Sequence, residues 1–68
     1  MRWTYGDSVQ AKIGAIVKPG EVVSITVVEG RQSEVFGFPP GTVLYTVEFP
    51  DGSDALIPEG ALLPSSVP

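Results

Sequence analysis

The sequence predicts a single small all-β domain. Short segments rich in β-branched and aromatic residues are separated by turn signals at intervals of about 8–12 residues, which is typical of small barrels and sandwiches. Eight glycines and seven prolines among the 68 residues supply those turns, and no segment has the periodicity of a helix of three turns. We therefore treat residues 1–68 as one domain, which at this size buries only about 60% of the surface that the unfolded chain exposes.

The first strand is expected at residues 8–13. Apolar and polar residues alternate there, so that Val9, Ala11 and Ile13 share one face, as in a half-buried strand. Residues 1–6, which precede it, form an N-terminal arm.

The chain is then expected to bend and turn. Gly14 favours a bulge or bend, after which the strand continues to Val17. Residues 18–21, Lys-Pro-Gly-Glu, predict the turn, because Pro19 presets φ at the second position and Gly20 accepts a positive φ at the third.

A second strand is predicted at residues 22–28, because every residue except Ser24 is β-branched. Val23, Ile25 and Val27 form one of its faces.

The most unusual segment is residues 31–41, Arg-Gln-Ser-Glu-Val-Phe-Gly-Phe-Pro-Pro-Gly. Its prolines and glycines argue against a helix and against a central strand. We expect a long loop, and loops of this length are often functional. Phe36 and Phe38 flank a glycine, and Pro39 and Pro40 stiffen the exit. Either both rings form an exposed apolar patch or one of them folds back over the barrel.

A closing hairpin follows. The strand at residues 42–49 alternates, with Tyr45 on the expected core face, and Asp51-Gly52 is a strong signal for a tight turn into a strand at residues 54–57.

The next four residues, 58–61, are too few for an α-helix and predict a 3₁₀ turn. This turn stands just before a last short strand at Leu62 and Leu63. It narrows the prediction to a small SH3-like barrel of about five short antiparallel strands. Residues 64–68 form a frayed tail.

Three short motifs resemble the plasmid- and integron-borne type II dihydrofolate reductases. They are Gly6-Asp7-x-Val9-x-x-Lys12-x-Gly14-Ala15, Tyr45-Thr46-Val47-Glu48 and Pro58-x-x-Ala61-Leu62. The resemblance implies an SH3-like barrel from a bacterial mobile-element cassette that assembles as a tetramer around a shared pore. The chain is more broadly similar to small bacterial SH3-like proteins of unknown function.

Residues 54–57 depart from the reductase pattern. In that family a Val-Gln-Ile-Tyr tetrapeptide lines the pore, whereas this chain has Asp-Ala-Leu-Ile. The family's pore-flanking lysine aligns with Ala11, next to Lys12. An acid in place of the valine, with the glutamine and tyrosine missing, argues against binding of an anionic cofactor and hence against reductase activity.

Composition restricts the chemistry and the partners. The chain has no histidine and no cysteine, which excludes His-based nucleophilic catalysis and His or Cys metal ligation. Its net charge is −4 and its four basic residues are dispersed, so nucleic-acid binding is disfavoured. Neither a signal-peptide pattern nor a membrane-spanning apolar run is visible, and the cytoplasm is the expected location.

Carboxylates gather around the closing turn, and they offer an acid/base pair or a calcium site as alternatives to a solvated hairpin tip. We expect the solvated tip, with Asp51 as a turn former, and therefore no catalytic residue, no metal and no cofactor. The acidic residues of this group are Glu48, Asp51, Asp54 and Glu59.

The sequence therefore predicts a non-enzymatic protein-interaction module or small accessory protein, whose partner is another protein or a second copy of itself rather than a small molecule or a membrane. The alternatives are an oligomeric ligand-binding or reductase-like pore protein and an acidic immunity- or antitoxin-like inhibitor. The candidate interaction surface is aromatic and proline-rich: Trp3, Tyr5, Phe36, Phe38, Pro39 and Pro40.

Overall fold

The computed structural model describes residues 2–65, so the end of the predicted frayed tail, residues 66–68, lies outside the described residues. The elements follow in the order β1 (Ser8–Ile13), β2 (Ile16–Val27), η1 (Gly30–Gln32), α1 (Ser33–Phe36), β3 (Val43–Glu48), β4 (Asp54–Pro58), η2 (Glu59–Ala61) and β5 (Leu62–Pro64).

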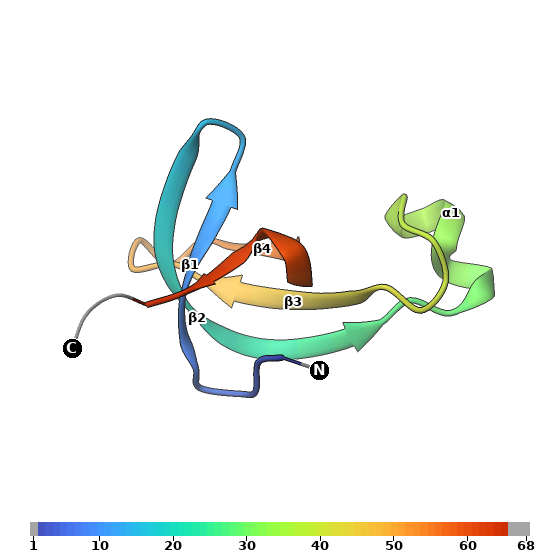
Figure 1. Ribbon diagram of the computed structural model, residues 1–68, viewed down its shortest axis with the longest axis horizontal. Coiled ribbons are helices and arrows are strands. Elements are labelled where there is room, and N and C mark those ends of the chain that lie inside the picture. Colours follow the sequence, from blue (N-terminus) through green and yellow to red (C-terminus); the bar gives the residue numbers. More distant parts are fainter. Residues whose placement is uncertain (1, 66–68) are drawn as a thin grey trace.

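All five of these strands belong to one antiparallel sheet in the order β4-β3-β2-β1-β5 (Figure 1). The 3₁₀ turn η2 immediately precedes the last strand. The sequence predicted an all-β class, about five short antiparallel strands and this turn, and all three are confirmed.

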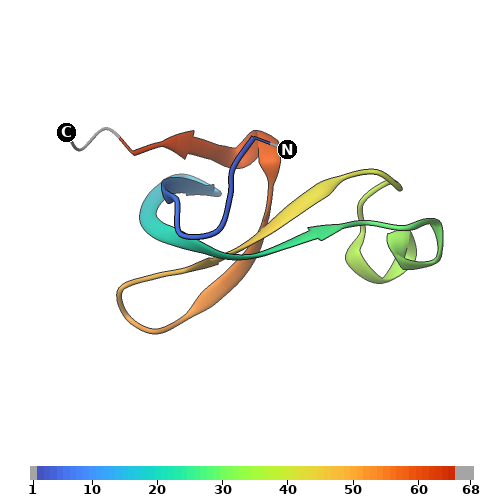
Figure 2. The same cartoon turned by 90° about the horizontal axis from the view of Figure 1, so that it is seen from below.

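The long strand β2 gives the sheet its bend. Residues 16–21 pair with β1, and residues 21–27 pair with β3, with a register shift between Val22 and Ser24. A bulge of this kind bends a strand and increases its twist. Figure 2 shows the resulting curl, in which β1 and β5 lie across one end of the β2–β3 pair.

The turn predicted at residues 18–21 is wrong, because this segment lies within β2. The chain reverses instead at Gly14 and Ala15, between the paired residues Ile13 and Ile16. Gly14 has a φ of 59°, as the first position of a type II′ hairpin requires. Pro19 has no N–H to donate to a neighbouring strand. It is tolerated in β2 because the pairing of β2 with β3 begins only at residue 21.

The expectation that residues 31–41 contain no helix is also wrong, because η1 and α1 lie within residues 30–36. The prolines follow the helical turns and do not interrupt them. At the start of η1, the backbone N–H of Glu29 donates to Gln32 Oε1 at 3.1 Å. At the end, Gly37 has a φ of 75° and donates its N–H to the Ser33 carbonyl at 2.8 Å, which is a common helix C-terminus.

The main hydrophobic core lies inside the curled sheet and takes residues from β1, β2, β3, β4 and β5. Trp3, from the N-terminal arm, packs against it. Its buried members are Val9, Ala11, Val22, Tyr45, Val47, Phe49, Ile57 and Leu62.

The molecule is elongated, with extents of 39 × 22 × 19 Å. The end of the β2–β3 pair and residues 28–42, called here the 28–42 loop, project away from the core (Figures 1 and 2). Val28 and Leu44, near the base of this loop, are also buried but do not belong to the main core cluster. Burial of apolar side chains therefore extends beyond the main core to the base of the loop.

Candidate functional site

The six predicted surface residues differ in exposure. Tyr5 is exposed, and so are Pro39 and Pro40 in the 28–42 loop. Trp3 is half-buried against the core, and Phe36 and Phe38 are each half-buried.

The structure does not gather these residues into one aromatic groove. The stretch before β1 runs beside the middle of β2, where the Gly6 N–H donates to the Val22 carbonyl at 2.8 Å. The 28–42 loop lies at the far end of the β2–β3 pair in both views (Figures 1 and 2). Trp3 and Tyr5 are therefore separated from the phenylalanines and prolines of the loop.

A polar network fixes the N-terminal arm to the core. The hydroxyl of Tyr45 donates to Glu59 Oε2 at 2.6 Å. The same hydroxyl accepts hydrogen bonds from the backbone N–H groups of Arg2, at 3.1 Å, and Trp3, at 3.2 Å. The Arg2 N–H also reaches Glu59 Oε2, at 3.0 Å. Sequence analysis placed Tyr45 in the core, and it is fully buried there. The role of its hydroxyl was missed, because no local pattern links it to an arm more than forty residues away.

This network shifts two pKa values in opposite directions. Burial raises the pKa of Tyr45, and the hydrogen bond to Glu59 raises it further. The bond from the Tyr45 hydroxyl lowers the pKa of the Glu59 carboxyl, and the Arg2 N–H lowers it further. Both shifts favour a neutral phenol bonded to a charged carboxylate.

The Glu59 shift predicts a contribution to stability that depends on pH. Because the folded-state pKa of Glu59 is depressed, this contribution is complete above the unfolded pKa and is lost as pH falls through the folded one. Urea unfolding from about pH 7 down to about pH 3 is expected to show a smaller loss of stability for Glu59→Gln than for the parent. Equal pH dependence of the two proteins would show that Glu59 does not contribute.

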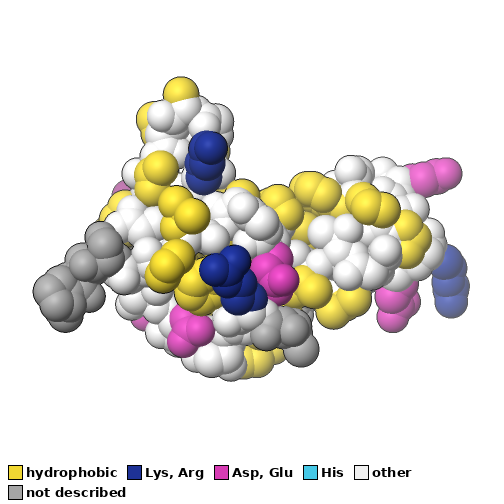
Figure 3. Space-filling view, in the orientation of Figure 1, with side chains coloured by type: hydrophobic (Ala, Val, Ile, Leu, Met, Phe, Trp, Pro, Cys, Tyr) yellow, Lys and Arg dark blue, Asp and Glu magenta, His cyan; other side chains and the backbone are white. Residues whose placement is uncertain are grey.

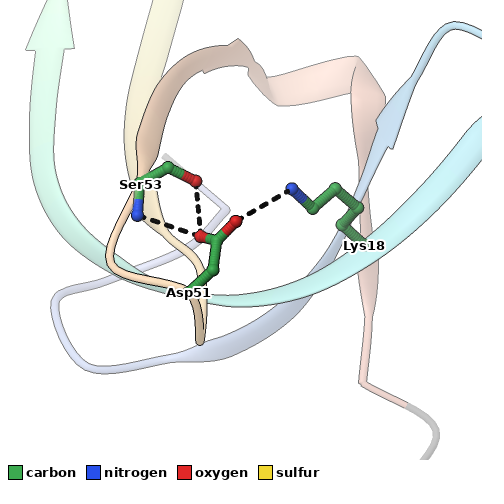
Figure 4. Close-up of polar contacts among 3 residues, drawn as sticks. All are labelled: Lys18, Asp51 and Ser53. Atoms are coloured by element: carbon green, nitrogen blue, oxygen red, sulfur yellow. Dashed lines mark hydrogen bonds and ion pairs between the residues drawn. The ribbon is translucent and has the colours of Figure 1, made fainter.

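The closing turn has the local structure expected of a hairpin tip. Asp51 Oδ1 accepts the Ser53 N–H at 2.9 Å and the Ser53 hydroxyl at 2.6 Å (Figure 4). These bonds, more than the nearby Lys18 ammonium, lower the pKa of Asp51. Lys18 Nζ is 4.0 Å from Asp51 Oδ2 and 4.4 Å from the centre of the Phe49 ring. Among residues 2–65, no group of three or more acidic side chains has a geometry suited to a metal ion.

Large apolar side chains are exposed at several places outside the core. Val35 of α1 is the most exposed of them, at 80%. Ile16 and Val17 form a second exposed pair at the start of β2. The sequence-based prediction named the phenylalanines of the 28–42 loop and missed Val35. The signal for an exposed valine was its place after four polar residues, in a short segment bounded by Gly30 and Gly37.

Comparison of the chain with protein-family models, with curated proteins and with solved structures finds no match. In the described part of the chain, no helix has the length and apolar character needed to cross a membrane.

Proposed function

We propose that this chain is a non-enzymatic protein-interaction module or small accessory protein built on an SH3-like barrel. Its binding surface is the 28–42 loop together with the adjoining end of β2, and its partner is a second copy of the chain. The cytoplasm is the compartment that we propose, on the sequence argument alone.

The observation that carries this proposal is the exposure of Val35 at the projecting end of the molecule. Val27, at the end of β2, is also exposed, at 47%. Figure 3 shows hydrophobic side chains over this end of the molecule, at the right of the view. An apolar surface on a projecting element is typical of a protein contact, because association removes it from water.

The charges around Val35 favour pairing with a second copy. Arg31 and Glu34 are both exposed and lie three residues apart on successive helical turns, which places them on similar sides of the segment. In a two-fold symmetric dimer the same patch meets itself, so Arg31 of each copy can face Glu34 of the other. Each copy then brings one cation and one anion that can pair across the two-fold axis beside the apolar contact of Val35.

The proposal predicts that Val35→Glu weakens self-association by at least tenfold, because a charge would enter an apolar contact. The measurement is the solution mass by light scattering after gel filtration, over a tenfold range of concentration.

The matched control is Val17→Glu, which places the same charge at an exposed valine of the β1–β2 hairpin and is expected to leave association unchanged. A parent protein that stays monomeric would contradict the proposal. A tetramer unaffected by Val35→Glu would contradict it too, and would favour assembly around the exposed edge of β4.

A further inference from the structure

We infer that a hollow at the other end of the molecule binds an arginine side chain presented by an extended segment of a partner protein. The hollow has a volume of about 490 Å³. It lies near the β3–β4 turn and the end of β5, opposite α1 along the long axis (Figure 1). Its lining residues are Ser8, Pro19, Gly20, Glu21, Glu48, Phe49, Pro50 and Ser65.

Two acidic residues that line this hollow lie opposite each other on neighbouring strands. Glu21 of β2 pairs with Glu48 of β3, and Glu48 pairs on its other side with Asp54 of β4. Side chains opposite each other across antiparallel strands have Cβ atoms about 4.5–5.5 Å apart, and like charges there are destabilising. Within residues 2–65, no basic side chain forms an ion pair with Glu21 or Glu48. All three acidic residues are exposed, so this acidic row faces solvent with no ion pair to a basic side chain of the described residues.

The basic residue closest in the sequence is already engaged. Lys18 Nζ lies over the Phe49 ring. The same ammonium group reaches toward Asp51 (Figure 4). The carboxylates of Glu21 and Glu48 are thus left for a cation from outside the chain.

The remaining walls of the hollow suit the stem of a long basic side chain. Pro19, Phe49 and Pro50 provide apolar surface. Long basic residues lay their methylene groups on apolar surface while the charged end stays among polar groups. The guanidinium of arginine has five donors in a planar fork and can bond two carboxylates at once, which the point charge of lysine does less well.

A calcium ion fits this hollow less well than arginine does. Calcium takes six to eight oxygen ligands, whereas the lining has two carboxylates and a partly apolar wall. The net charge of −4 also favours encounter with a basic partner. Charge complementarity and the apolar walls together point to an arginine-bearing peptide segment.

The test is a titration of the full chain with the peptide acetyl-Leu-Arg-Leu-amide, followed by amide chemical shifts in ¹⁵N NMR spectra. Saturable shifts are expected at the residues that line the hollow, with affinity that falls as salt rises. The same peptide with citrulline, a neutral isostere of arginine, is expected to bind at least tenfold more weakly.

The variant Glu21→Gln/Glu48→Gln is expected to lose at least tenfold in affinity for the arginine peptide. It removes a repulsion, so it is expected to fold, and the dispersion of its NMR spectrum checks this. The control Glu29→Gln removes a negative charge on the 28–42 loop, at a residue outside the proposed contact between Arg31 and Glu34, and its affinity for the arginine peptide is expected to match that of the parent.

Equal binding of the citrulline peptide would overturn the inference. So would unchanged affinity in the Glu21→Gln/Glu48→Gln variant, shifts located on the 28–42 loop, or displacement of the peptide by low-millimolar calcium. None of these readouts depends on self-association through Val35, so the inference and the proposed function can fail separately.

Discussion

Replacing Gly20 with alanine is expected to lower the free energy of unfolding by about 1–3 kcal/mol, the usual cost of overpacking a close contact. A Cβ at this position would lie 2.9 Å from the Glu48 carbonyl oxygen and would press against the side chains of Val47 and Phe49. The carbonyl belongs to the backbone of β3, so it cannot move aside without disturbing the sheet. Urea or thermal unfolding followed by circular dichroism measures the loss.

The matched control is Gly30→Ala. An added Cβ there meets no atom within 4 Å, and the φ of Gly30 is not positive. Its stability is expected to equal or slightly exceed that of the parent, because alanine reduces the entropy of the unfolded chain. If both variants were equally stable, β3 would not cross β2 as closely as the structure places it.

Tyr45→Phe is expected to destabilise the fold by about 1–3 kcal/mol, because it removes a buried hydroxyl and leaves its partners unpaired. The backbone N–H of Trp3 loses its acceptor, and the Glu59 carboxylate loses its shortest hydrogen bond. The N-terminal arm should then detach more readily. Trp3 is the single tryptophan in the chain, so a red shift of its fluorescence at neutral pH reports that detachment directly.

Tyr5→Phe is the control for this substitution. Tyr5 is 64% exposed and its hydroxyl makes no hydrogen bond to another residue in the described range 2–65. Its removal is expected to leave both stability and fluorescence unchanged. A Tyr45→Phe protein that matched the Tyr5→Phe protein in both measurements would show that the network does not hold the arm.

The parts of the fold that sequence analysis predicted correctly depend on local patterns. Alternation placed Val9 and Ala11 on the buried face of β1, and Tyr45 and Val47 on that of β3. The Asp-Gly pair predicted the β3–β4 turn, and the short segment after β4 predicted η2.

The errors arose where two local signals competed. Gly14 and the Pro19-Gly20 pair are both turn signals, and only tertiary pairing decides between them. Because β2 crosses β3 closely at residue 20, the glycine there serves the crossing, and the turn forms at Gly14. In the 28–42 loop, Pro39 and Pro40 argued against any helix in the prediction. They follow Gly37, the residue that ends α1, so they do not prevent the helix.

The candidate sites were harder to predict than the fold because they depend on contacts between distant strands. The pairing of Glu21 with Glu48 needs the register of β2 against β3, which no single segment specifies. The separation of Trp3 and Tyr5 from the 28–42 loop likewise follows from the direction in which the β2–β3 pair extends.

Intermolecular NOEs in a sample that mixes ¹³C-labelled and unlabelled chains test the central claim most directly. The proposed dimer predicts NOEs between the Val35 methyl groups of one copy and the 28–42 loop of the other. A monomer at millimolar concentration, or intermolecular NOEs confined to the edges of β4 or β5, would contradict the claim that this loop is the binding surface.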